Sequence, residues 1–149
     1  MEDISITFHV EITNWKKEQN VDLTFYLNNK IICERKQVNG YQKICVEHVE
    51  LEDNTEYMLS MYISGLDSSY TEVDKDGNIV NDVLVVVKNI EIDEIPIDNL
   101  CYKNSVYCPE YPEWVKGNDT INCETHLGWN GTWSICITSP IYLWLLEHM

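Results

Sequence analysis

Apolar and polar residues alternate along much of the first half of the chain. Every second residue is apolar over residues 4–12, 21–27 and 57–63. This period of two predicts β-strands with one buried face. Residues 83–87 are continuously apolar, Ile90 and Ile92 follow, and the run predicts a buried strand. No amphipathic helix is predicted in the first hundred residues.

Asn-Gly pairs separate β-prone runs at two places, Asn39-Gly40 and Asn130-Gly131. Because Asn-Gly favours a two-residue turn, each pair predicts a β-hairpin. The loop length of the first hairpin decides whether Cys33 faces Val46 or Cys45, and the sequence leaves both registers open.

Short strands separated by turns predict an all-β protein, an antiparallel β-sandwich of the jelly-roll type. The composition changes after residue 97, where four of the six cysteines and four of the five tryptophans occur. We therefore expect a sandwich over residues 1–97 and a Cys/Trp-rich extension over residues 98–149. Near its end, Ser139-Pro140 favours the start of a helix, although a short apolar strand fits almost as well.

The chain is strongly acidic, with 10 Lys and Arg against 25 Asp and Glu, and its formal net charge is −15. Phosphate recognition needs clustered cations, so nucleic acid and anionic membranes are not expected partners. The charge suits divalent cations, or it serves solubility alone. No apolar run approaches the roughly 20 residues of a membrane-spanning helix. The first residues show no signal peptide, so we expect synthesis and retention in a cytoplasm.

The sequence does not indicate an enzyme. It contains no nucleophile elbow, phosphate-binding loop or ordered Ser-His-Asp set. Its carboxylates concentrate at turns, where solvation or metal binding explains them better than paired-acid catalysis.

Six cysteines allow three interpretations: disulfides, a zinc site or free thiols. Their spacing contains no Cys-x2-Cys pair, which disfavours zinc. The absence of a signal peptide disfavours disulfides, and free buried thiols are common. The state of these cysteines stays open at the level of the sequence.

An acidic loop precedes the apolar run at residues 83–92. Calcium binds six to eight oxygens from carboxylates, amides and main-chain carbonyls, and this loop supplies such groups at close spacing. A solvated acidic turn is the alternative. The spacing is not that of an EF-hand, because the glycine stands at the fourth position and Val85 at the twelfth. The candidate calcium ligands are Asp67, Asp74, Asp76, Asn78 and Asp82.

Three segments within residues 20–97 resemble the calcium-dependent carbohydrate-binding modules that bind xylan. They contain Tyr26-Leu27-Asn28-Asn29, Leu66-Asp67 and the run Asp82 to Asp93. The resemblance implies a jelly-roll sandwich whose calcium sits in the acidic loop and is completed by sugar hydroxyls. It implies that Asp67 and Asp82 are metal ligands and that Asp74 is a third. Val83 and Val85 differ from the family's residues on the side that touches the sugar.

Residues 127–149 resemble the ends of structural proteins from tailed phages, especially cyanophage-like viruses. This resemblance implies a virion protein made in a host cytoplasm.

Tyr70, Trp129 and Trp133 are the candidate sugar-contacting residues, because sugars pack on aromatic rings. The apolar terminus predicts an interface with other virion subunits or with further copies, through Tyr142, Trp144 and Leu145.

Two hypotheses follow from the sequence. In the first, the chain is a non-catalytic, calcium-dependent carbohydrate-binding module that contacts host glycans from a virion surface or tail. In the second, it is a structural virion or assembly subunit, in which calcium only rigidifies the loop.

Overall fold

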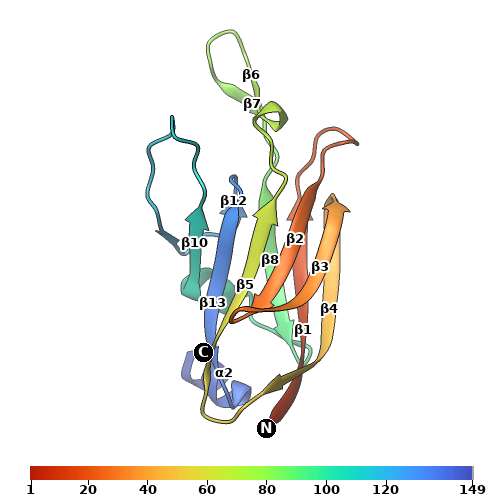
Figure 1. Cartoon of the computed structure of the whole chain (residues 1–149), viewed down its shortest axis with the longest axis vertical. Helices are drawn as coiled ribbons and strands as arrows, with labels where there is room; N and C mark the ends of the chain where they lie inside the picture. The colour runs from red at the N-terminus through yellow and green to blue at the C-terminus, as the bar shows by residue number, and fades with distance from the viewer. Residues whose placement is uncertain (149) are drawn as a thin grey trace.

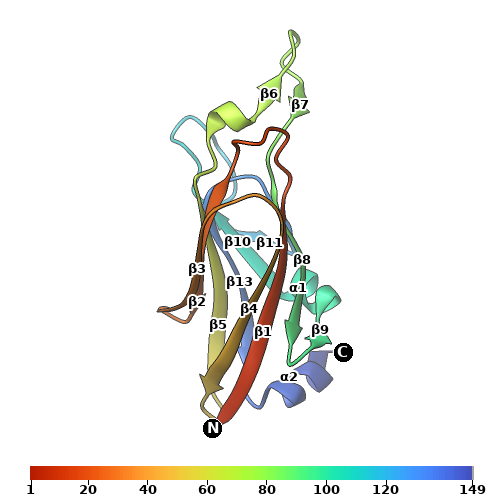
Figure 2. The same ribbon diagram turned by 90° about the vertical axis from the view of Figure 1, so that its right-hand side faces the viewer.

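The predicted strands form two antiparallel sheets that pack face to face. The computed structural model describes residues 1–148. Figure 2 shows the sheets as two layers. Sheet A is five-stranded: β12 (His126–Leu127), β8 (Val85–Ile92), β1 (Glu2–Ile12) and β4 (Gly40–Leu51) follow in that order, and β9 (Ile95–Pro96) pairs with β8. Sheet B is six-stranded, in the order β11 (Ile121–Asn122), β10 (Ser105–Pro109), β13 (Gly131–Thr138), β5 (Glu56–Ser64), β2 (Val21–Leu27) and β3 (Lys30–Val38).

The alternating apolar residues form the core between the sheets. Phe8 of β1 and Phe25 of β2 meet across the two layers with their ring centroids 4.3 Å apart. Both side chains are at most 1 % exposed. Truncation of such a buried aromatic residue to alanine costs about 3–5 kcal/mol, so the period-two pattern carries much of the stability. The predicted all-β sandwich is confirmed.

The residues after 97 build both sheets. Strand β13 lies between β5 and β10 in sheet B, and β12 pairs with β8 in sheet A. The sequence prediction placed these strands in an extension beyond a sandwich of residues 1–97. The structure differs because β2 pairs with only one edge of β5. Strand β13 supplies hydrogen-bond partners for the main-chain groups on the other edge.

Neither predicted Asn-Gly hairpin forms, and both predictions are wrong. Asn39-Gly40 joins β3 of sheet B to β4 of sheet A, and Asn130-Gly131 lies between β12 of sheet A and β13 of sheet B. Each turn therefore crosses from one layer to the other, because the strands on its two sides pair with more distant partners. A disulfide between Cys33 and Cys45 is also excluded. Cys33 pairs with Phe25 in sheet B, whereas Cys45 pairs with Thr7 in sheet A.

Four of the six cysteines lie in the two sheets, and no disulfide joins any two cysteines within residues 1–148. Cys45 and Cys108 are exposed, whereas Cys101 is 1 % exposed. Burial, and next to it a hydrogen bond to Glu56, raise the pKa of the Cys136 thiol to about 11.

Two short helices complete the fold. Helix α1 (Asp98–Asn104) connects β9 to β10, and α2 (Ile141–His148) follows β13. The carboxylate of Glu2 accepts a hydrogen bond from the Ile141 N–H at 3.0 Å and so ties α2 to β1. The helical alternative for residues 141–148 is the one that forms. No helix among residues 1–148 has the length and apolarity to cross a bilayer.

The acidic loop forms a projecting hairpin. Strands β6 (Glu72–Val73) and β7 (Ile79–Asn81) pair only with each other and rise above one end of the sandwich, as Figure 1 shows. The loop after β10 rises at the same end, whereas α2 lies at the opposite end.

Candidate functional site

A cleft of about 790 Å³ lies at the end of the sandwich from which the β6–β7 hairpin projects. We call it the apical cleft. Its walls come from three connecting segments: residues 66–83, which include the short 3₁₀ turn η1 (Ser68–Tyr70), residues 110–114 after β10, and residues 128–130 between β12 and β13. The functionally notable lining residues are Tyr70, Tyr111, Trp114 and Trp129 among the aromatics and Asp67, Asp82 and Glu110 among the acids.

One face of the apical cleft is aromatic. Tyr111 meets Trp129 edge-on, with ring centroids 5.4 Å apart and an interplanar angle of 75°. Gly117 lies so close to the Tyr111 ring that an added Cβ would come within 2.6 Å of it. Trp114 is 76 % exposed, an unusual position for a large apolar side chain. Such exposed rings beside a cleft are suited to ligand contact.

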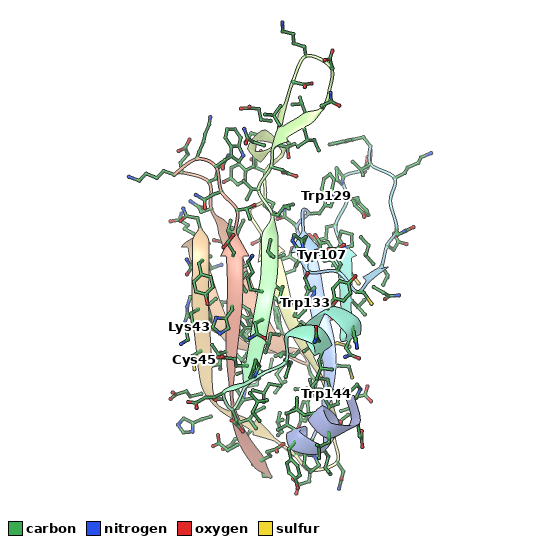
Figure 3. The ribbon with its side chains drawn as sticks, turned by 180° about the vertical axis from the view of Figure 1, so that it is seen from behind. Lys43, Cys45, Tyr107, Trp129, Trp133 and Trp144 are labelled. Carbon is green, nitrogen blue, oxygen red and sulfur yellow. The ribbon has the colours of Figure 1, made fainter. Side chains whose placement is uncertain are left out.

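Trp129 is fixed by the core beneath it. The Tyr107 hydroxyl donates a hydrogen bond to the Trp129 carbonyl and accepts one from the Trp129 N–H at 3.0 Å. Tyr107 is 2 % exposed, and this burial raises the pKa of its hydroxyl. Figure 3 shows Trp129 above Tyr107 at this end of the sandwich. The aromatic wall is therefore anchored through main-chain atoms to sheet B.

Asn130 joins the three segments that form the cleft. Its Oδ1 accepts a hydrogen bond from the Leu66 N–H at 2.8 Å, and its Nδ2 donates to the Leu66 carbonyl at 3.1 Å. Its own carbonyl accepts from the Glu110 N–H at 2.8 Å. The spacing between the walls is thus set by one amide side chain and one main-chain bond.

The carboxylates of the cleft are held by short local contacts. Asp67 caps η1, where its Oδ1 accepts a hydrogen bond from the Ser69 N–H. This hydrogen bond lowers the pKa of the Asp67 carboxyl. Asp82 Oδ1 accepts from the Thr71 hydroxyl at 2.8 Å and from the Val83 N–H at 2.9 Å. The hydrogen bond from the Ser69 N–H to Asp67 and both bonds to Asp82 are made to Oδ1.

The five predicted calcium ligands are not assembled around one point. Asp67 and Asp82 line the apical cleft, whereas Asp74, Asp76 and Asn78 lie in the turn of the β6–β7 hairpin. Asp74 Oδ1 accepts from the Asp76 and Asn78 N–H groups at 2.9 Å each, and the Asn78 bond is the main reason that the Asp74 pKa is lowered. Among the side chains that the structure describes, no three from His, Cys, Asp or Glu converge closely enough to hold a metal ion.

The predicted sugar-contacting and interface residues are divided in the same way. Tyr70 and Trp129 line the cleft, and the Tyr70 hydroxyl bonds the Asn20 main chain. Trp133 is 1 % exposed in the core, where its indole donates to the Glu124 carbonyl, so it presents no face to a sugar. In the terminal helix α2, Tyr142 is 59 % exposed, but Trp144 and Leu145 pack into the core of this same chain.

Sequence reasoning missed Glu110 and Tyr111, which line the cleft beside Trp114. They lie in a Pro-rich stretch, residues 109–114, that shows no period of two or 3.6. The only signal was composition, because two aromatic residues and two acids within six positions are typical of a functional loop.

The fold is similar to that of known carbohydrate-binding modules. The carbohydrate-binding module vCBM60, solved in complex with galactobiose, superposes with a TM-score of 0.51 over 88 % of this chain and 96 % of that chain, at 14 % identity. A selenomethionine form of vCBM60 superposes with a TM-score of 0.51 over 89 % of each chain at 13 % identity. That second structure is described in connection with a circular permutation that links two families of calcium-dependent carbohydrate-binding modules. At this identity the similarity establishes the shared fold.

No protein-family model matches the chain, and no curated protein matches it.

Proposed function

We propose that this chain is a non-catalytic carbohydrate-binding module and that its glycan binds in the apical cleft. The observation that carries this proposal is the lining of the cleft. Aromatic rings at Tyr111, Trp114 and Trp129 offer flat surfaces to the apolar faces of sugars, while Asp67 and Asp82 offer acceptors to their hydroxyls. The galactobiose bound by vCBM60, which has a similar fold, supports this choice of ligand.

The dimensions of the cleft agree with an oligosaccharide. Its volume of about 790 Å³ falls in the range of ligand sites, roughly 300–1,000 Å³. Its walls are held by Asn130 and Tyr107 before any ligand arrives. A preformed site loses less conformational entropy on binding.

Calcium belongs to the proposal as an ion that binds together with the glycan. Asp67 and Asp82 both line the cleft, and carboxylate oxygens coordinate calcium along with hydroxyls and carbonyls. Two carboxylates are fewer than a high-affinity site uses. We therefore expect calcium to raise glycan affinity, and glycan to raise calcium affinity by the same factor. The relation of vCBM60 to calcium-dependent families supports this part of the proposal.

A glycan array probed with the full chain, with calcium and with chelator, tests the function. The matched variants are Trp114→Ala in the cleft and Tyr142→Ala on α2 at the opposite end. Both remove an exposed aromatic ring, 76 % and 59 % exposed, so both should fold. We expect glycan binding to fall about fivefold or more for Trp114→Ala, from the loss of about 1–3 kcal/mol of ring contact.

Tyr142→Ala should bind as the unmodified chain does. A chain that binds no glycan in calcium refutes the proposed function. Binding that is equally strong in Trp114→Ala refutes the assignment to the apical cleft, and equal binding in chelator refutes the role of calcium alone.

One observation favours the second hypothesis, a structural subunit. Tyr142, Leu143 and Leu146 of α2 are 59 %, 45 % and 67 % exposed and form an apolar surface at the end opposite the cleft. Exposed apolar patches are common at subunit contacts. Analytical ultracentrifugation of the chain and of Leu146→Glu distinguishes a structural subunit from a binding module. A structural subunit should self-associate as its concentration rises, and the Leu146→Glu variant should not. A virion location stays a prediction from the sequence of the tail.

A further inference from the structure

We infer that, when no calcium is bound, the apical cleft prefers glycans whose sugars carry amino groups and rejects glycans whose sugars carry carboxylates. This inference rests on the proposed carbohydrate function and names the class of sugar that the same cleft selects.

The charge of the lining is of one sign. Asp67, Asp82 and Glu110 face the cleft, and no Lys, Arg or His side chain lines it in the part of the chain that the structure describes. A uronic acid or sulfated sugar would lose part of its hydration on entry and find no counter-charge. A sugar ammonium would find three carboxylates in the calcium-free cleft. The formal net charge of −15 extends the same preference to long-range attraction.

Glu110 is the carboxylate best placed to select an ammonium. The Tyr62 hydroxyl donates to its Oε1 at 3.1 Å and lies 3.4 Å from Oε2. Its main-chain N–H donates to the Asn130 carbonyl at 2.8 Å. The Tyr62 contact restricts this long, exposed side chain, and the main-chain bond fixes the backbone that carries it, so less conformational entropy remains to be lost when a ligand binds. A carboxylate accepts about four hydrogen bonds, which leaves acceptor positions for the ligand.

The aromatic wall favours the same charge. Trp114 and Tyr111 follow Glu110 within four residues, and all three line the cleft. Ring faces attract cations through their quadrupole, and carboxylates attract them through their charge. A neutral sugar uses only the ring contact. An amino sugar gains the ring contact, the cation–ring attraction and the ion pair.

The test compares hexasaccharides of one length on the full chain: a glucosamine hexamer, its N-acetylated form and a galacturonate hexamer. Isothermal titration calorimetry is run with chelator, at low salt and at about pH 5.5, where primary amines and carboxylates are both charged. We expect the amine hexamer to bind about tenfold more tightly than the acetylated hexamer, and the galacturonate hexamer to bind most weakly. At about pH 9 the amine loses its charge and the preference should disappear.

Glu110→Gln and Glu113→Gln form the matched pair of variants. Both remove one carboxylate from the same exposed loop, but only Glu110 lines the cleft. We expect Glu110→Gln to reduce the amine preference to about two- to threefold, whereas Glu113→Gln keeps it.

Each remaining outcome overturns the inference. Equal affinity for the amine and acetylated hexamers overturns it and leaves the proposed carbohydrate function standing. Binding of none of the hexamers in chelator, together with an array without signal in calcium, refutes both. A lysine hexapeptide that binds as tightly as the amine hexamer shows that charge is recognised without the sugar, and it also overturns the inference.

Discussion

The hydroxyl of Tyr107 offers the most direct test of how the core supports the cleft. Tyr107→Phe keeps the buried ring and removes one oxygen. That oxygen bonds both the N–H and the carbonyl of Trp129. Each bond contributes about 1 kcal/mol net, and a main-chain group left without a partner adds a further penalty of about 1–3 kcal/mol when it is buried. Because Trp129 is only half-buried, water can replace part of the loss, and we expect a total of about 2–3 kcal/mol.

Equilibrium unfolding in urea measures this change. The midpoint should fall with an unchanged slope, because the surface exposed on unfolding is the same. For a chain of this size each 1 kcal/mol lowers Tm by about 2–4 °C, so a decrease of about 4–12 °C is expected. Tyr102→Phe is the matched control, since the exposed Tyr102 hydroxyl makes no hydrogen bond to residues 1–148. A loss below about 0.5 kcal/mol in Tyr107→Phe would refute the anchoring role.

The same variant predicts a pH dependence. Burial raises the pKa of Tyr107 in the folded chain, whereas the unfolded chain ionises near the ordinary value of about 10. The stabilisation is therefore complete below about pH 10 and is lost as the pH rises from there towards the folded pKa. Tyr107→Phe lacks this ionisation. The stability difference between the two proteins should narrow above about pH 10, and a constant difference would contradict the assignment.

Three further predictions concern other parts of the chain. Gly131→Ala should cost more than about 3 kcal/mol in urea unfolding, because φ is +150° and the new Cβ would lie 2.4 Å from the Cys108 carbonyl; near-normal stability would contradict the close approach. Asp74→Ala removes the acceptor for two N–H groups of its own turn, so hydrogen exchange should quicken in the β6–β7 hairpin while Tm stays unchanged, because that hairpin is a separate two-stranded sheet; a lower Tm would show that the hairpin supports the sandwich. Iodoacetamide at about pH 8 should label the exposed Cys45 before Cys136, whose pKa is raised to about 11, and mass spectrometry showing the reverse order would contradict the burial of Cys136.

The strands could be predicted from the sequence, but their pairing could not. The alternation over residues 4–12 and 21–27 gives β1 and β2 nearly to their ends, because a strand with one buried face requires it. The hairpin prediction at Asn39-Gly40 was wrong because turn residues indicate only that the chain changes direction locally. They do not indicate which strands then pair. Gly40 has φ of +67°, which a hairpin and a crossing between sheets both accept. Whether a hairpin or a crossing forms depends on the strands that pair with β3 and β4. These strands, β2 and β1, lie more than 10 residues before Asn39-Gly40 in the sequence.

The candidate site was predictable only in part, because the sequence shows which charged residues occur but not which groups they contact in the fold. The charge of the acidic loop located Asp67 and Asp82, since carboxylates beside an apolar strand are visible in the sequence. The sequence did not show that Asp74 is used by its own turn, because an Asx-type capping contact and a metal ligand need the same residue at the same spacing. Glu110 and Tyr111 were missed because an irregular loop carries no periodicity.

The central position of β13 has a consequence for biosynthesis. Strand β5 is translated about 70 residues before β13, which becomes its neighbour in sheet B. At ribosomal rates this interval lasts roughly 4–15 s. Throughout that time the nascent polypeptide exposes one unpaired edge of β5, with Leu59, Met61 and Ile63 on its apolar face. Such an edge invites association between neighbouring nascent chains. The protein should therefore depend on chaperone capacity more strongly than its size alone suggests.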